Sequence, residues 1–344
     1  MPQVTNRVAI GFRRAAAIVV VVATILTAPP VRAADLAQST EEARFEQHFH
    51  ELLWHDRTDE LDVLAAQLRR DRARFDDGRW KLAILYWTVG RIPWDADDTK
   101  IADARARLAA WRAKHPDSPT PHIALAQLVI GEAWRARGHK FANEVTEEQW
   151  RGFHEKVHEA HQLLDSTKAV ASACPGWYEA MQIVALMENW SPARTQQLFD
   201  EAVSHEPLYQ PLYFNREQSL QPQWGGSLQQ IAAFAERAAE LTKATEGRSM
   251  YARVLWAGVQ AEGTKPLEDG TFDWQKMKQG FRDLMERYPK SDRNLQAFAR
   301  YAWAANDKAT AAEIFKKLGD DWYSDIWGNR DRFEYARKWA LDGK

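Results

Sequence analysis

The stretch that decides the fold runs over residues 177–207, WYEAMQIVALMENWSPARTQQLFDEAVSHEP. It predicts a helix, a short break and a second helix. In the second half, Phe199, Ala202 and Pro207 have the order and spacing typical of a tetratricopeptide-like repeat. Ala311 and Phe315 add the Ala-x3-Phe spacing of such repeats, so we expect more than one helical hairpin of this kind.

The rest of the chain carries the same helical pattern. Apolar residues recur every three or four positions from Phe45 to Trp339, and no stretch alternates as a strand would. We therefore predict an all-α fold, an irregular tetratricopeptide-like solenoid of antiparallel helical hairpins. We expect residues 34–344 to form a single α-helical repeat domain, and any subdivision to fall at the polar connector 139–146.

Two predicted helices have stripes that we expect to face the core. Trp80, Ile84 and Trp87 lie at helical spacing on a helix that starts near residue 80. A long helix is predicted from Glu147 to about Ala173. Its apolar stripe consists of four residues, Phe153, Val157, Ala160 and Leu164.

Turn and cap signals fix several helix ends. The acids at 95–98 suit a helix N-terminus better than a metal site, because a helix dipole favours negative charge there. Ser227, followed by Gln230, has the form of a capping box. Gly225 and Gly226 allow the tight turn before that helix.

The N-terminus has the layout of a secretory signal peptide over residues 1–33. Arg13 and Arg14 precede an apolar run at 15–26, and small residues follow up to Ala33, where we expect cleavage. That run is about half of the roughly 20 residues that span a bilayer, so we predict no membrane insertion after cleavage. The expected location is periplasmic or secreted.

Charge and cysteine content narrow the classes of partner. Cleavage would remove four arginines and no acids, which takes the formal net charge from −2 to −6. This gives no electrostatic reason to expect nucleic acid as a partner.

The single cysteine, Cys174, cannot close an intramolecular disulfide, and its apolar context predicts an inert buried thiol.

The chain is rich in tryptophan, with 16 of them spread along its length. We expect most of these rings to pack between helices, where a large flat side chain fills space. The alternative is a groove lined with exposed rings.

Several short motifs, taken in order, resemble a bacterial exported family of unknown function with tetratricopeptide-like helices. The resemblance extends from about Phe45 to Trp327, and its clearest signature is the Trp-Gly-Gly-Ser at 224–227. It implies a helical repeat fold and brings no catalytic residues. Its other motifs are Asp77-Gly78-Arg79-Trp80-Lys81-Leu82, Pro175-Gly176-Trp177-Tyr178, Glu206-Pro207-Leu208-Tyr209 and Phe234-Ala235, with Glu246-Gly247, Tyr251-Ala252 and Phe298-Ala299.

One motif suggests metal chemistry. His154 and His158 lie four residues apart on one helix face, where both could bind Zn²⁺ while Glu155 acts as general base. A third ligand would come from His161 or Glu179. We favour the other interpretation, a polar helix flank, because the histidines lie beside the core stripe and no glycine turn follows them.

Three functions follow from these patterns. We expect first an interaction scaffold of the cell envelope that binds a protein or peptide partner, with no catalytic residue and no cofactor assigned. The second is a zinc-dependent hydrolase that uses His154, Glu155 and His158. The third is envelope glycan binding through exposed tryptophans.

Overall fold

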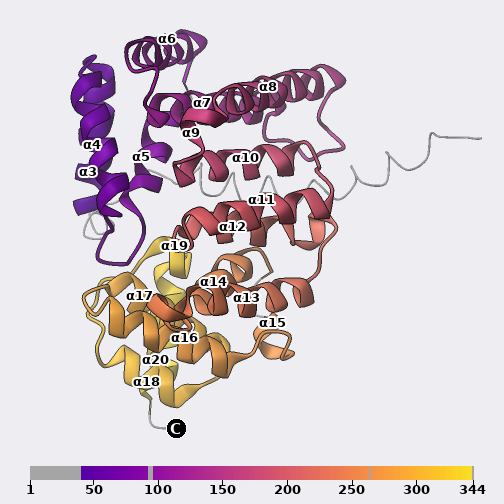
Figure 1. Cartoon of the computed structure of the whole chain (residues 1–344). Coiled ribbons are helices and arrows are strands. Elements are labelled where there is room, and N and C mark those ends of the chain that lie inside the picture. Colours follow the sequence, from indigo (N-terminus) through magenta and orange to yellow (C-terminus); the bar gives the residue numbers. More distant parts are fainter. Residues whose placement is uncertain (1–39, 92–95, 263–264, 343–344) are drawn as a thin grey trace, which may run out of the picture. The chain divides into compact units, whose positions relative to one another are not determined.

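The computed structural model describes residues 40–91, 96–262 and 265–342, and every regular element in these ranges is a helix (Figure 1). This confirms the all-α prediction. The expected signal segment at 1–33 lies outside the described residues. No helix in these ranges combines the length and the apolar character that a membrane crossing requires.

The chain forms two compact units. The first contains Ala43–Ala73 and Trp80–Ser219, and the second contains Arg74–Arg79 and Leu220–Lys344. The connector at 139–146 lies within the first unit.

Among the described residues, the first unit holds ten helices. The first of them, α3, begins just before the unit does. In chain order they are α3 (Thr40–Trp54), α4 (Thr58–Asp71), α5 (Lys81–Gly90), α6 (Asp98–Lys114), α7 (Pro119–Arg137), α8 (Glu147–Ser166), α9 (Lys168–Ala171), α10 (Pro175–Met187), α11 (Pro192–His205) and α12 (Gln210–Ser219).

Helix α7 forms the centre of this unit. It packs against α5, α6, α8 and α10, and Figure 1 shows it side by side with α8. Ser118 caps its N-terminus by accepting a hydrogen bond from the Thr120 backbone N–H. Because α7 is covered on several sides, its apolar residues are buried around most of its circumference.

Helix α8 confirms the predicted core stripe, since its buried residues are Phe153, Val157, Ala160 and Leu164. Its predicted end near Ala173 is wrong, because the helix stops at Ser166 and a short α9 follows.

The side chains at the C-terminus of α8 explain this stop. The Thr167 hydroxyl donates to the Leu163 carbonyl at 2.7 Å, and the Trp177 indole N–H donates to the Leu164 carbonyl at 2.9 Å. These bonds satisfy carbonyls that the end of a helix leaves free.

The hairpin at 177–207 is confirmed as two helices, α10 and α11, with a break between them. Asn189 turns the chain there with φ of 55°, a left-handed conformation that asparagine tolerates. Trp177, Met181 and Val184 are buried in α10. Phe199 and Ala202 of the repeat-like pattern are buried in α11.

The predicted core stripe of α5 is wrong. Trp80 is buried but precedes the helix, Ile84 is partly exposed, and Trp87 is 42% exposed. The helix is apolar on almost every side, so two stripes at helical spacing compete. The face that packs inward consists of Leu82, Leu85, Tyr86 and Val89.

The second unit begins with a turn that matches the predicted glycine pair. Its helices are η3 (Pro222–Trp224), α13 (Leu228–Glu246), α14 (Ser249–Glu262), α15 (Lys265–Glu268), α16 (Trp274–Arg287), α17 (Asp292–Ala304), α18 (Lys308–Phe315), α19 (Ser324–Trp327) and α20 (Arg330–Leu341). Gly225 has φ of 87°, and a Cβ on Gly226 would lie 2.0 Å from the Leu220 carbonyl oxygen. Ser227 then caps α13 by accepting from the Gln230 backbone N–H.

The segment Arg74–Arg79 belongs to the second unit because polar bonds attach it there. The Asp77 carbonyl accepts from the Arg253 guanidinium at 2.5 Å and from the Asn294 amide at 3.1 Å. Arg74 donates to Glu246, a carboxylate whose side chain is only 2% exposed, at 2.9 Å. These contacts join residues that lie far apart in the sequence.

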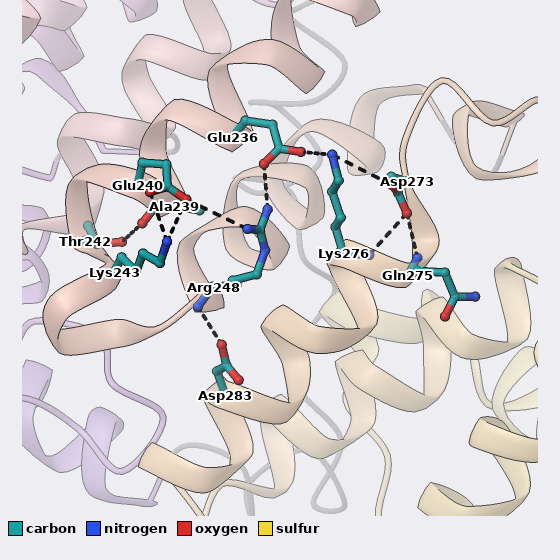
Figure 2. Close-up of polar contacts among 10 residues, drawn as sticks. All are labelled: Glu236, Ala239, Glu240, Thr242, Lys243, Arg248, Asp273, Gln275, Lys276 and Asp283. Atoms are coloured by element: carbon teal, nitrogen blue, oxygen red, sulfur yellow. Dashed lines mark hydrogen bonds and ion pairs between the residues drawn. The ribbon is translucent and has the colours of Figure 1, made fainter.

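A network of charged side chains links α13, α14 and α16 (Figure 2). Glu236 accepts from the Arg248 guanidinium at 2.6 Å and from the Lys276 ammonium. The Asp283 carboxylate accepts from the Arg248 backbone N–H at 2.6 Å. Burial raises the pKa of Glu236, but the bonds from Lys276 and Arg248 outweigh it and leave that pKa below its usual value. Both cations are therefore used to join helices.

Candidate functional site

A groove of about 620 Å³ lies in the first unit between α3, α5 and α6. Helix α3 contributes one face at helical spacing, which includes Ala43, Gln47, His50 and Trp54. Figure 1 shows these three helices in the indigo and purple part of the chain.

The end of α5 brings Trp87 and Val89 to the groove, and Arg91 follows directly after the helix. The first turns of α6 add Lys100 and Ile101. The lining is mainly apolar, with polar groups placed among the apolar ones. Such a lining and volume are typical of sites that bind small molecules or single side chains of a partner.

Trp87 distinguishes this groove from the rest of the molecule. Among the tryptophans that the structure describes, it alone has an exposed side chain, whereas Trp111, Trp177 and Trp327 are fully buried. Five of the described tryptophans are buried, and the others apart from Trp87 are partly exposed. An exposed indole in a groove is a ready contact for a ligand, because it offers a large apolar surface at low entropic cost.

Two arginines lie over the tryptophan rings of the groove. The Arg91 guanidinium carbon is 5.1 Å from the centroid of the Trp87 ring, and that of Arg107 is 5.3 Å from the Trp54 ring. His50 lies 5.5 Å from Trp54, ring centre to ring centre. Burial lowers the pKa of His50, so its imidazole is neutral at neutral pH.

Arg107 and Arg91 differ in whether the guanidinium forms ion pairs. Arg107 forms ion pairs with Asp56 at 2.6 Å and Asp103 at 3.2 Å. Neither Arg91 nor Lys100 forms an ion pair within the described ranges. Asp97 accepts from the backbone N–H of Lys100 at 2.8 Å as the cap of α6.

The structure places the candidate zinc ligands on the outer flank of α8. His154 stacks on Trp150 with ring centres 5.8 Å apart, and the His158 ring nitrogen lies 2.9 Å from the Gln162 amide. Glu155 is exposed. His161 pairs instead with Glu188, which follows α10 directly, at 2.8 Å.

No metal-holding arrangement follows from these positions. Across residues 40–91, 96–262 and 265–342, no three His, Cys, Asp or Glu side chains come together in a way that could hold a metal ion. The zinc hypothesis remains a prediction that metal analysis of untagged protein and of its His158→Ala variant would test.

Glu179, the other candidate ligand, lies on α10 in the interior of the first unit. The Tyr209 hydroxyl donates to its carboxylate at 2.5 Å, and no cation is among its recorded partners. Burial raises the pKa of Glu179 to about 7, although the bond from Tyr209 opposes that shift. Its role in this geometry is to join α10 to the start of α12.

Cys174 is fully buried, as its sequence context predicted. Its sulfur lies 3.1 Å from the Tyr86 hydroxyl and 3.9 Å from the Arg69 guanidinium. Burial raises the pKa of this thiol, so the reactive thiolate form is disfavoured.

Sequence reasoning missed the groove, although one signal was present. Trp87 and Arg91 lie four residues apart beside residues that interrupt the helix, and the apolar face of α3 ends in Trp54. These features become a site only when three segments far apart in the sequence meet. The chain finds no counterpart among family models, curated proteins or solved structures.

Proposed function

We propose that this protein is an exported, non-catalytic binding protein of the cell envelope whose ligand site is the groove between α3, α5 and α6. The exposed Trp87 in this mainly apolar groove is the observation that carries the proposal. The all-helical fold supports it, since stacked helical hairpins present such surfaces. The proposal includes a tetratricopeptide-like arrangement of the hairpins and a signal peptide at residues 1–33.

A peptide is the ligand class that fits the groove best. Its volume matches one or two large apolar side chains, and its lining mixes aliphatic groups with two indoles. An amphipathic segment that inserts apolar anchors into a groove between helices is a recurring mode of peptide recognition. Trp54 and Trp87 would contact those anchors.

The test is binding of a fluorescein-labelled peptide with a central Leu-Phe-Leu anchor, measured by fluorescence anisotropy. We expect saturable binding to the wild-type protein and a loss of affinity of roughly tenfold or more in Trp87→Ala, because a central aromatic contact commonly dominates binding energy. The matched control is Phe141→Ala, which removes another exposed aromatic side chain of the same unit, one that does not line the groove.

Equal affinity of wild type and Trp87→Ala would contradict the proposal, as would no binding of any peptide with an apolar anchor. Circular dichroism of both variants establishes that the fold is retained. Because Trp87 is 42% exposed, we expect the substitution to leave the helix content unchanged.

Glycan binding is the second candidate, and the same exposed indole favours it. Sugars stack on flat aromatic faces, and polar groups such as Gln47 and Thr88 line the groove beside the ring. Titration calorimetry with peptidoglycan fragments tests this candidate. Heat that saturates in wild type and disappears in Trp87→Ala would support glycan over peptide.

A further inference from the structure

We propose that the groove selects peptides that carry a carboxylate next to their apolar anchor, and that Arg91 and Lys100 are the residues that select them. This inference rests on the proposed function, because it specifies which peptides the groove binds. The inference adds a preference for acidic peptides, which the shape of the groove and its apolar contacts alone do not provide.

The groove carries two cations, Arg91 and Lys100. Both line the groove, and both are exposed. They come from different segments, Arg91 from the end of α5 and Lys100 from the first turn of α6. A peptide whose anchor contacts Trp87 would therefore place its flanking side chains within reach of two positive charges.

Within the described residues, these two charges lack the ion pairs that other cations of the unit form. Arg105 binds Glu132 at 2.6 Å and Glu159 at 2.5 Å, and Lys156 binds Glu132 at 2.7 Å. In the described part of the chain, Arg91 has only the ring of Trp87, and Lys100 has no ion pair. Unlike Arg105 and Lys156, these two cations do not join helices.

The contact between Arg91 and Trp87 prepares the guanidinium for an anion. A guanidinium that lies over an indole is oriented by the ring while its N–H groups at the edge stay free to donate. A carboxylate can accept two such bonds side by side. The same pair of residues would thus bind the apolar anchor through the ring and the acid through the guanidinium.

Among the described residues the lining contains one acid, Glu46, and this residue has an interaction partner of its own. His50 adds no positive charge at neutral pH, because burial lowers its pKa. The formal net charge of the chain is −2, so long-range attraction does not draw acidic peptides to it. The selection must come from local contacts with Arg91 and Lys100.

The experiment compares three labelled peptides that share the Leu-Phe-Leu anchor and differ only in flanking residues: glutamates, glutamines or lysines. We expect the glutamate peptide to bind wild type about fivefold more tightly than the glutamine peptide, since each exposed ion pair contributes modestly. The lysine peptide should bind most weakly. The glutamate preference should decrease as salt rises, because screening weakens exposed charge pairs.

The variant Arg91→Gln/Lys100→Gln should bind all three peptides with nearly equal affinity. Its matched control is Arg44→Gln/Lys140→Gln, which removes two exposed positive charges outside the groove lining and should keep the preference.

The outcomes separate this inference from the proposed function. If all three peptides bind wild type equally well and Trp87→Ala still weakens them, the binding function stands and the charge selection is overturned. If no peptide binds, the proposed function itself fails. Displacement of the glutamate peptide by dodecanoate, with the same dependence on Arg91 and Lys100, would assign the groove to an anionic amphiphile and overturn the peptide inference.

Discussion

The groove of the first unit and the α13–α14–α16 network of the second unit use their cations in opposite ways. In the network, Arg248 and Lys276 both bind Glu236 and so join three helices (Figure 2). At the groove, Arg91 and Lys100 form no ion pair within the described residues. In the network, a shared carboxylate joins the two cations, whereas at the groove no such carboxylate is found among the described residues.

The two units also differ in the partners of an interior carboxylate, Glu246 in the second unit and Glu179 in the first. Glu246 of the second unit has Arg74 at 2.9 Å and Arg287 at 3.2 Å, with Tyr288 donating at 3.1 Å. The Glu179 carboxylate of the first unit accepts a hydrogen bond from Tyr209 and forms no ion pair with the described residues. Four predictions follow, from the largest expected change in the free energy of unfolding to the smallest.

Glu246→Ala should lower the free energy of unfolding by about 3–5 kcal/mol, because it leaves Arg74 and neighbouring donors without their buried acceptor. Urea unfolding followed by circular dichroism measures the change. The control Glu240→Ala removes an exposed carboxylate of the same helix and should cost less than about 0.5 kcal/mol. A loss below about 1 kcal/mol for Glu246→Ala would contradict the importance of this pairing.

Glu179→Gln should remove a pH dependence of stability. Burial raises the pKa of Glu179 from 4.5 to about 7, so the folded state binds a proton that the unfolded state has lost. In wild type this contribution to stability is fully present below pH 4.5 and is lost as the pH rises through about 7. The loss amounts to about 3 kcal/mol at most.

Thermal unfolding of wild type and Glu179→Gln at pH 5 and pH 8 measures this effect. The variant keeps an acceptor for Tyr209 and should be the more stable protein at pH 8, with a smaller difference at pH 5. The same difference at both pH values would show that Glu179 is not protonated in the folded state.

Arg248→Gln should lower the free energy of unfolding by about 1 kcal/mol, since it removes the bond from the guanidinium to Glu236 but keeps the backbone bond to Asp283. Chemical unfolding checks the value. In Lys243→Gln an exposed i,i+3 pair is lost instead, and we expect no more than about 0.3 kcal/mol. Equal losses in the two variants would remove the distinction between a bridging cation and a surface cation.

Arg91→Gln/Lys100→Gln should change the free energy of unfolding by less than about 0.5 kcal/mol, because neither side chain forms an ion pair in the described structure. The same unfolding measurement applies. A loss comparable to that of Arg248→Gln would mean that these cations stabilise the fold and would break the comparison between the two regions.

The sequence was most informative where a helix is polar on one side. In α8, charged residues surround a single apolar stripe, so Phe153 and Val157 were assigned to the core correctly. In α5, apolar residues surround the helix and the stripe through Trp87 was as regular as the one through Leu85. Only the packing of neighbouring helices decides between two such stripes.

Contacts between distant segments were not predictable from the pattern. The stop of α8 depends on the indole of Trp177 from the next hairpin, and the groove needs α3, α5 and α6 together. The spacing of His154 and His158 was visible in the sequence, but the partner of each ring was not. The spacing of residues along the sequence predicts helices and their caps. A binding site depends in addition on which helix faces pack against one another.

The exposure of Trp87 gives the protein a built-in optical probe. Because the other tryptophans of the described chain are shielded to a greater degree, iodide should quench the emission of Trp87 before that of the others. The nearby positive charge of Arg91 should raise the local iodide concentration and increase this selectivity. Comparison with a Trp87→Phe variant isolates the signal, so occupancy of the groove can be followed without any attached label.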